Sequence, residues 1–347
     1  MGFPSEQTIL VIGANGYIAL HIINELLQSG YRVRGTVRSQ KASDKVRETF
    51  PSYWGSRLEI AFVTGLTDSE KYNGALDDTI TAVIHTASPV HGVVEDNIRD
   101  MLNPAIQGAT AILDAVSRLA SSSCRRVVHL SSLSAMLNPA QGFRPGYTYS
   151  EKDYNPITFD EAVSIEDRGE LYIASKSLSE RAVWDWFSQN KPSFDLVCIN
   201  PSMILGPHLD RIESTQTTST GAMLWAIVDA TYIPALMFGG CVDARDCAAI
   251  IRAAIETPEA SGQRYLVAHH FDWQTAADIA REHHPELASR IPIGEPGSGK
   301  SKAEERIYQV DGSKVVQQLG VGYRSLNTTV SDSMLEFLAA KKREHNL

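Results

Sequence analysis

The sequence predicts an α/β fold in which helices cover both faces of a doubly wound parallel β-sheet. Short apolar runs alternate with longer segments that carry apolar residues at helical spacing, and such runs are typical of strands buried on both faces. A glycine-rich turn joins the first run to the first helical segment. The runs that fit strands are residues 8–12, 32–37, 58–63, 81–86, 126–130 and 195–199. The clearest helical segments are residues 17–27, 97–119 and 171–187.

The first strand and helix illustrate how each element is assigned. Residues 8–12 (TILVI) form an apolar run that ends at a glycine, as a buried parallel strand does. Residues 17–27 then place isoleucine and leucine on one helical face, and Gly30 follows as a C-terminal cap. The later runs and helical segments repeat this order. Sheets of this kind bind ligands at the carboxyl ends of their strands.

Residues 13–19 (GANGYIA) have the context of a dinucleotide-binding loop, because a strand precedes them and an amphipathic helix follows. Gly13 permits the tight turn, Gly16 lets the backbone approach a pyrophosphate, and Ala19 packs the helix on the strand. The positive end of the helix would face the phosphates. The loop therefore predicts a Rossmann-type site, and its candidate cofactor-binding residues are Gly13, Asn15, Gly16, Tyr17 and Ile18.

Residues 294–301 (GEPGSGKS) match the letters of an ATP-binding phosphate loop but lack its context. Residues 290–293 fit at most a short strand, and the segment after the motif is too brief for a core helix. Only 46 residues follow Ser301, too few for the second acidic motif with which such ATPases hold magnesium. We expect a glycine- and serine-rich surface loop instead.

The end of the second strand indicates which dinucleotide binds. An NAD site usually has an acid about 20 residues after the first glycine, and residues 33–39 (VRGTVRS) contain none. Arg38 can grip a 2′-phosphate with its planar guanidinium. Residues 32–47 are strongly basic within a chain of net charge −9. The sequence therefore predicts NADP(H), bound as NADPH.

Tyr172 and Lys176 carry the clearest catalytic signal. Residues four apart share a helix face, so a phenol and an ammonium can act together. A neighbouring cation favours the phenolate form, and such a tyrosine can give a proton to a carbonyl oxygen or take one back. Ser132 follows the strand 126–130, where a hydroxyl can hydrogen-bond a substrate carbonyl.

These motifs, in this order, resemble the extended short-chain dehydrogenases/reductases over nearly the whole chain. The branch to which the chain is most similar holds dihydroflavonol reductase, cinnamoyl-CoA reductase and fungal ketone and aldehyde reductases. The motifs are GANGYIA, VRGTVRS, HTASP (85–89), LSS (130–132), YIASK (172–176) and INPSMILGP (199–207), together with YSEKDYNP (149–156), which resembles the fungal members.

The resemblance implies a catalytic group of Ser132, Tyr172 and Lys176. Lys176 would also hold the nicotinamide ribose, and Asn103 would support a water-linked proton path. Arg38 and Lys45 match the family's grip on the 2′-phosphate. The other residues implied to contact the cofactor are Thr86, Ala87, Ser88, Pro201, Ser202 and Met203. One departure is Gly65, which stands where the family usually has the aspartate that contacts adenine.

After Pro201 the strand–helix pattern loosens. We predict an NADP-binding Rossmann domain over residues 1–200, to which residues 243–268 return. Residues 201–242 and 269–347 would form a smaller C-terminal substrate-binding lobe. The residues predicted to contact substrate are Ser134, Met136 and His208.

The function predicted is an NADPH-dependent carbonyl reductase of natural-product metabolism, acting on a ketone or an aldehyde. Two alternatives stay open: a nucleotide-sugar epimerase or dehydratase with bound NAD, and a non-catalytic NADP-sensing protein. The acidic composition argues against nucleic acid or an anionic membrane as partner. The polar start and the absence of a run of about 20 apolar residues favour a cytoplasmic protein. We expect no metal, because the four cysteines and the paired histidines lack metal-ligand spacing. We also expect a monomer or a homodimer.

Overall fold

The computed structural model describes residues 3–87, 94–215 and 219–344. Its main sheet has seven strands in the order β10-β7-β5-β4-β1-β2-β3, and every neighbouring pair is parallel. The fold class predicted from the sequence is confirmed, and the six predicted strands lie within two residues of their expected ends. The strands are β1 (Thr8–Ile12), β2 (Arg32–Val37), β3 (Leu58–Phe62), β4 (Ile80–His85), β5 (Arg126–Leu130), β7 (Asp195–Pro201) and β10 (Arg264–Val267).

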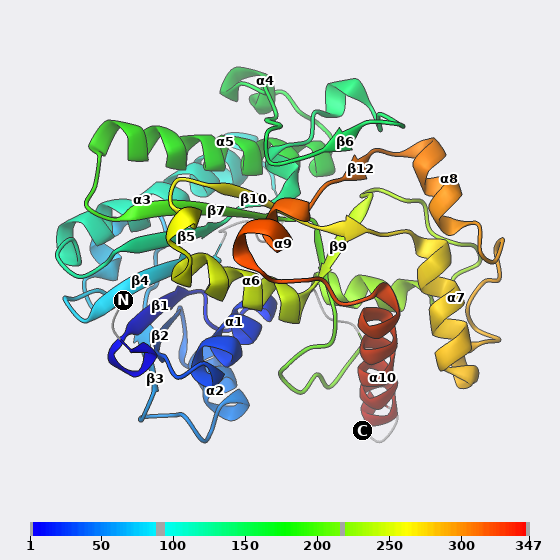
Figure 1. Ribbon diagram of the computed structural model, residues 1–347, viewed down its shortest axis with the longest axis horizontal. Coiled ribbons are helices and arrows are strands. Elements are labelled where there is room, and N and C mark those ends of the chain that lie inside the picture. The colour runs from blue at the N-terminus through cyan, green and yellow to red at the C-terminus, as the bar shows by residue number, and fades with distance from the viewer. Residues whose placement is uncertain (1–2, 88–93, 216–218, 345–347) are drawn as a thin grey trace.

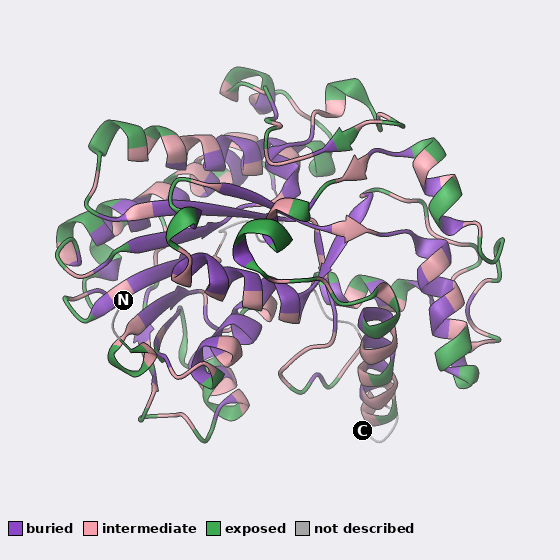
Figure 2. Ribbon diagram, viewed as in Figure 1, coloured by how far each residue is buried: buried purple, intermediate pink, exposed green. Residues whose placement is uncertain are grey.

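Helices cover both faces of this sheet (Figure 1). On one face α1 (Tyr17–Gln28) packs against α6 (Ala244–Glu256), and on the other α3 (Asn103–Leu119) packs against α5 (Arg168–Asn190). Strand β1 is apolar throughout because both of its faces are buried. Ile9 and Val11 belong to the hydrophobic core under α1 and α6, and Leu10 and Ile12 belong to the core under α3 and α5. Figure 2 shows the resulting continuous buried interior along the strands. Helix α2 (Gln40–Thr49) lies beside β2.

Most of the remaining chain lies beside the carboxyl ends of the strands (Figure 1), whereas α4 packs on α5 and α9 packs on α6 and β10. A three-stranded sheet of order β11-β9-β8 shares a core with α7 and α10, and β12 pairs with β6. The division into two domains remains a prediction. The elements are β6 (Thr148–Tyr149), α4 (Phe159–Val163), β8 (Met203–Leu205), β9 (Gly240–Asp243), β11 (His269–His270), α7 (Trp273–His283), α8 (Gly299–Arg306), β12 (Gln309–Val310), α9 (Ser313–Leu319) and α10 (Leu326–Glu344).

The helix expected over residues 97–119 is interrupted near its start. Residues Ile98–Leu102 form a π-helical turn, and α3 begins at Asn103. Pro104 has no N–H and therefore cannot donate the hydrogen bond of a regular helix to the preceding turn. Such turns occur frequently at functional sites. The helical segment expected over residues 97–119 is therefore present, but the apolar spacing did not show that its first turn is π-helical.

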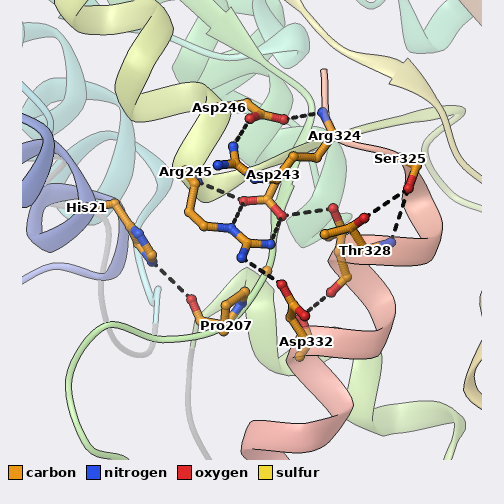
Figure 3. A network of polar contacts seen from close by, with 12 residues as sticks. His21, Pro207, Asp243, Arg245, Asp246, Arg324, Ser325, Thr328 and Asp332 are labelled. Atoms are coloured by element: carbon orange, nitrogen blue, oxygen red, sulfur yellow. Dashed lines mark hydrogen bonds and ion pairs between the residues drawn. The ribbon is translucent and has the colours of Figure 1, made fainter. Parts of the chain in front are cut away.

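A network of charged groups joins α6 to α10 (Figure 3). Asp243 is fully buried and caps α6, accepting from the N–H of Arg245 at 2.9 Å and from its Nη2 at 2.7 Å. Thr329 of α10 donates to the same carboxylate at 2.8 Å, and Arg245 also reaches Asp332 at 2.6 Å. Burial by itself would raise the pKa of Asp243, but the hydrogen bonds and charge of Arg245 hold that pKa below its ordinary value.

Two further results concern the described part of the chain. None of its helices is long and apolar enough to cross a membrane. None of its clusters of three or more histidine, cysteine, aspartate or glutamate side chains is placed to hold a metal ion.

Candidate active site

The loop between β1 and α1 has the geometry of a phosphate-binding turn. Gly13 adopts a φ of 81°, which favours glycine, and a Cβ there would lie 3.1 Å from the Cβ of Ala87. The loop is tied to β2, because the N–H of Gly13 donates to Thr36 Oγ1 at 3.2 Å and the N–H of Ala14 to the Thr36 carbonyl at 2.9 Å. A larger residue at position 13 would therefore be strained and would crowd Ala87.

The start of α1 fits a pyrophosphate. Its N-cap residue Gly16 is exposed and makes no side-chain cap, so the N–H groups of the first turn have no such partner. Asn15 and Ile18 are half-buried beside it. The Tyr17 hydroxyl donates to the Gly206 carbonyl at 2.7 Å, and burial raises the pKa of Tyr17 well above its ordinary value. Any cofactor contact of Tyr17 would therefore come from its backbone.

The basic residues in β2 and after it fall into two groups, those that pair with another described residue and those that do not. Some are already paired, as Arg34 is with Glu59 at 2.6 Å and Arg47 with Asp44 at 2.9 Å. Arg38 is exposed and has no hydrogen bond or ion pair with any described residue. A guanidinium left free beside the loop fits the 2′-phosphate of NADP(H).

Helix α2 carries two lysines, Lys41 and Lys45, that follow Arg38 in the same basic segment. Lys45 Nζ lies 2.9 Å from Asp210 Oδ2, so its ammonium is shared with a carboxylate of the segment after β8. Lys41 is exposed and has no partner among the described residues, which makes it a further candidate that sequence reasoning did not single out. The sequence feature that could have identified Lys41 is its position three residues after Arg38 in the same basic segment.

We predict that Arg38→Ala weakens NADPH binding about 10- to 100-fold, because charge-assisted hydrogen bonds contribute about 1.5–3 kcal/mol. Binding of NADH should be unchanged, since it has no 2′-phosphate. Fluorescence titration of both nucleotides checks the result. Arg47→Ala, on α2 and already paired with Asp44, is the control and should leave both affinities unaltered. An equal loss for NADH would show that Arg38 acts on the fold and not on the phosphate.

The ends of β4 and β7 carry the other residues expected at the cofactor. Thr86 donates to the Ile12 carbonyl at 2.6 Å and, with Ala87, is half-buried beside the loop. Ser88 lies outside the described residues. Pro201 ends β7 and Met203 begins β8, while the Ser202 hydroxyl donates to the Gly240 carbonyl at 2.6 Å.

The proposed catalytic side chains come from two elements that pack together, α5 and the 3-10 turn Leu133–Ala135 after β5. Tyr172 is 36% exposed, and Lys176 Nζ lies 5.8 Å from the centroid of its ring. Ser132 Oγ accepts from the N–H of Ser134 at 3.1 Å and stays partly exposed. The hydroxyl of Ser131 is bonded to the buried Glu180, so Ser132 is better placed to meet a substrate.

Two buried histidines lie next to Lys176, and sequence reasoning missed them. His85 and His129 are register partners on β4 and β5, and their Nδ1 atoms are 3.2 Å apart. Burial and, to a smaller extent, the charge of Lys176 together lower the pKa of His129 to about 3. Burial, His129 and Lys176 also hold the pKa of His85 well below its ordinary value. Both rings are therefore neutral near neutral pH.

Asn103 occupies the first position of α3, directly after the π-helical turn. It is half-buried, and its side chain has no hydrogen bond to a described residue. Since α3 packs on α5, the amide lies on a helix adjacent to the one that carries Tyr172. Its part in proton transfer stays a prediction.

Two of the residues predicted to contact substrate, Ser134 and Met136, are buried, and His208 is half-buried with a side chain that is 3% exposed. Met136 is 1% and Ser134 2% exposed, and Met136 packs in a cluster with Ile173, the neighbour of Tyr172. His208 bonds to Ser219 Oγ at 2.7 Å, and its ring lies 4.8 Å from that of Tyr17. These contacts give His208 a packing role between α1 and the segment after β8, so its substrate role stays a prediction.

The GEPGSGKS segment is an exposed loop over residues 294–297 that leads into the first turn of the short helix α8, which begins at Gly299, and residues 290–293 form no strand. Its backbone amides already have acceptors: the N–H of Glu295 donates to Gln274 Oε1 and that of Gly297 to Asp278 Oδ2, both at 2.9 Å. A carboxylate therefore occupies the place that a phosphate would need. This agrees with a surface loop and not with an ATP site.

Comparison with known proteins shows relatives with the same fold over nearly the whole chain. The model of the "NAD dependent epimerase/dehydratase family" matches residues 9–268. Ketoreductase azaE of Aspergillus niger is 36% identical, over 96% of this chain and 98% of its own. The NADPH-dependent methylglyoxal reductase GRE2 of Saccharomyces cerevisiae is 31% identical, over 97% and 100%. The crystal structure of yeast methylglyoxal/isovaleraldehyde reductase Gre2 complexed with NADPH is 30% identical and superposes with a TM-score of 0.89 over 97% of this chain and all of that one.

Proposed function

The chain belongs to the NAD dependent epimerase/dehydratase family, and from this premise we propose that it is an NADPH-dependent carbonyl reductase. The observation that carries the proposal is the meeting of three features at the carboxyl edge of one sheet. These are an uncapped helix start for the pyrophosphate, a free guanidinium for the 2′-phosphate, and Tyr172 with Lys176 on the helix that packs beside Ser132. Full-length relatives with reductase names support it.

Bound NADPH would supply hydride to the carbonyl carbon of the substrate. The residues of the chain do the rest. The Tyr172 hydroxyl donates its proton to the carbonyl oxygen, and the Ser132 hydroxyl orients that oxygen by a hydrogen bond. The Lys176 ammonium, with its Nζ 5.8 Å from the Tyr172 ring centroid, favours the phenolate that remains. Asn103 supports the return of a proton to Tyr172.

The substrate class is a medium-sized ketone of natural-product metabolism or a small aldehyde. The names of the relatives support both, since one is a ketoreductase and another a methylglyoxal reductase. A cytoplasmic location and a monomeric or homodimeric state complete the proposal.

The epimerase alternative is distinguished by what happens to the nucleotide. A UDP-glucose 4-epimerase from Bifidobacterium longum shares 18% identity and a TM-score of 0.68, a likeness of fold alone. An epimerase regenerates its bound NAD in each cycle, whereas a reductase consumes NADPH. No acid stands at the end of β2 to hold the 2′-hydroxyl of NAD, which favours the reductase.

The test is an NADPH-oxidation screen at 340 nm over a panel of aldehydes and ketones, including methylglyoxal, isovaleraldehyde and aromatic ketones. The proposal expects oxidation of NADPH with at least one of them and much slower oxidation of NADH. Absence of turnover on the whole panel, in a protein that binds NADPH, would favour the sensing alternative. Tightly bound NAD in the purified protein would favour the epimerase.

A further inference from the structure

A buried ion pair joins α5, the helix that carries Tyr172 and Lys176, to strand β10. The proposed reaction does not use this pair. Glu180 is 2% exposed and lies one helical turn after Lys176 and two after Tyr172 on α5. Its Oε1 lies 2.5 Å from Nε of Arg264, which is 6% exposed and begins the edge strand β10.

The Glu180 carboxylate connects α5 to the ends of two central strands. The Ser131 hydroxyl, just after β5, donates to Oε2. The Asn200 side chain on β7 donates to the same Oε2 at 2.5 Å and also to the backbone carbonyl of Ser132 at 3.1 Å. One carboxylate therefore links the helix that carries Tyr172 to the peptide that carries Ser132.

Arg264 extends the connection to the segment that precedes α4. Its Nη1 donates to the carbonyls of Glu151 at 2.7 Å and Asp153 at 2.8 Å, and its guanidinium lies 3.8 Å from the Tyr154 ring centroid. Helix α5 contacts the same segment, since the Ser177 hydroxyl donates to the Asn155 carbonyl at 3.2 Å. The helix is thus held on two sides.

Stability alone does not explain this pair. A buried ion pair can often be replaced by apolar residues without loss of stability, because removing both charges from water is costly. Orientation of catalytic groups is more demanding, since small displacements lower turnover strongly. We propose that Glu180 is a positioning residue, which holds α5 against the ends of β5 and β7 so that Tyr172 and Ser132 address the same carbonyl oxygen. The inference rests on the proposed function.

Glu180→Gln tests it, because the change keeps the size of the side chain and removes its charge. We expect kcat to fall about 10- to 100-fold, with the Kd for NADPH unchanged. The deuterium isotope effect on kcat, measured with NADPH labelled at the transferred hydrogen, should rise because hydride transfer becomes more strongly rate-limiting. A purely structural role would lower the folded fraction and leave the isotope effect at its wild-type value.

Asp195→Asn is the matched control. Its carboxylate pairs with Arg126 at 2.5 Å and joins β5 to β7 at their opposite ends. This variant should lose stability but keep the turnover per folded molecule and the isotope effect.

If Glu180→Gln does not fold, the double variant Glu180→Gln/Arg264→Met leaves no unpaired charge and should show the same rise in isotope effect. Wild-type turnover and isotope effect in whichever variant folds, or an equal rise in Asp195→Asn, would overturn the inference. Failure of the wild-type protein to oxidise NADPH with any carbonyl would instead refute the proposed function, before any variant is compared.

Discussion

Replacement of Tyr172 by phenylalanine is expected to lower kcat for carbonyl reduction about 100- to 10,000-fold, the range typical of a lost general acid. The change removes the donated proton and keeps the aromatic ring near Lys176. NADPH affinity should be unaltered, because the phosphate contacts lie at the loop after β1 and beyond β2. Steady-state rates and a fluorescence titration of NADPH measure the two effects on the same preparation.

Tyr53→Phe serves as the control for that change, since Tyr53 lies in the turn after α2 and its hydroxyl has no hydrogen bond to a described residue. It should leave both kcat and NADPH affinity at wild-type values. Turnover that survives in Tyr172→Phe would remove the proposed proton donor, whereas loss of NADPH binding would show that the hydroxyl belongs to the cofactor site.

Asp243→Asn is expected to lower the free energy of unfolding by about 1.5–3 kcal/mol, because it removes the buried carboxylate that accepts from Arg245 and leaves that arginine paired with Asp332 alone among the described residues. The same change weakens the contact of α10 with α6, which depends on the bond from Thr329 to this carboxylate (Figure 3). Urea denaturation measures the loss. Asp229→Asn is the matched control: it breaks an exposed pair with Arg290 and should cost less than about 1 kcal/mol. Equal losses in the two variants would contradict the role of the buried network.

The contribution of Asp243 also has a defined pH dependence. Because its folded pKa lies below the unfolded value of about 3.9, the stabilisation is complete well above that pH and is lost as pH falls through the folded pKa. The contribution of Asp246 to the free energy of unfolding has the opposite pH dependence, because burial raises the pKa of Asp246 and its contribution therefore becomes more favourable as pH falls. The difference in unfolding free energy between wild type and Asp243→Asn should therefore narrow between neutral pH and about pH 3. A difference that stays constant would show that the charge of Asp243 does not matter.

The strands and the nucleotide loop could be predicted because their signals are local. A strand buried on both faces reads as a continuous apolar run, as in residues 8–12, and a tight turn into a helix requires the glycine at position 13. The π-helical turn before Asn103 could not be predicted, because its local pattern is that of another structure. Its apolar spacing is that of a regular helix, and Pro104 was the one local sign of a break.

The pairings between distant residues could not be predicted. His85 lies 44 positions from His129, and Glu180 lies 84 positions from Arg264. Each becomes a neighbour only through the order of the strands in the sheet. For the same reason, the sequence assigned His208 to substrate by its place after a motif, whereas its contacts to Ser219 and Glu336 depend on how the last helix packs.

Transfer of deuterium from labelled NADPH tests the central claim most directly. The protein would be incubated with a carbonyl compound and NADPH that carries deuterium at the transferred position, and the product examined by mass spectrometry. We predict an alcohol with one deuterium on the former carbonyl carbon and one NADP⁺ formed for each alcohol. A product without deuterium, or an altered substrate with no net oxidation of NADPH, would contradict the assignment of the chain as a carbonyl reductase.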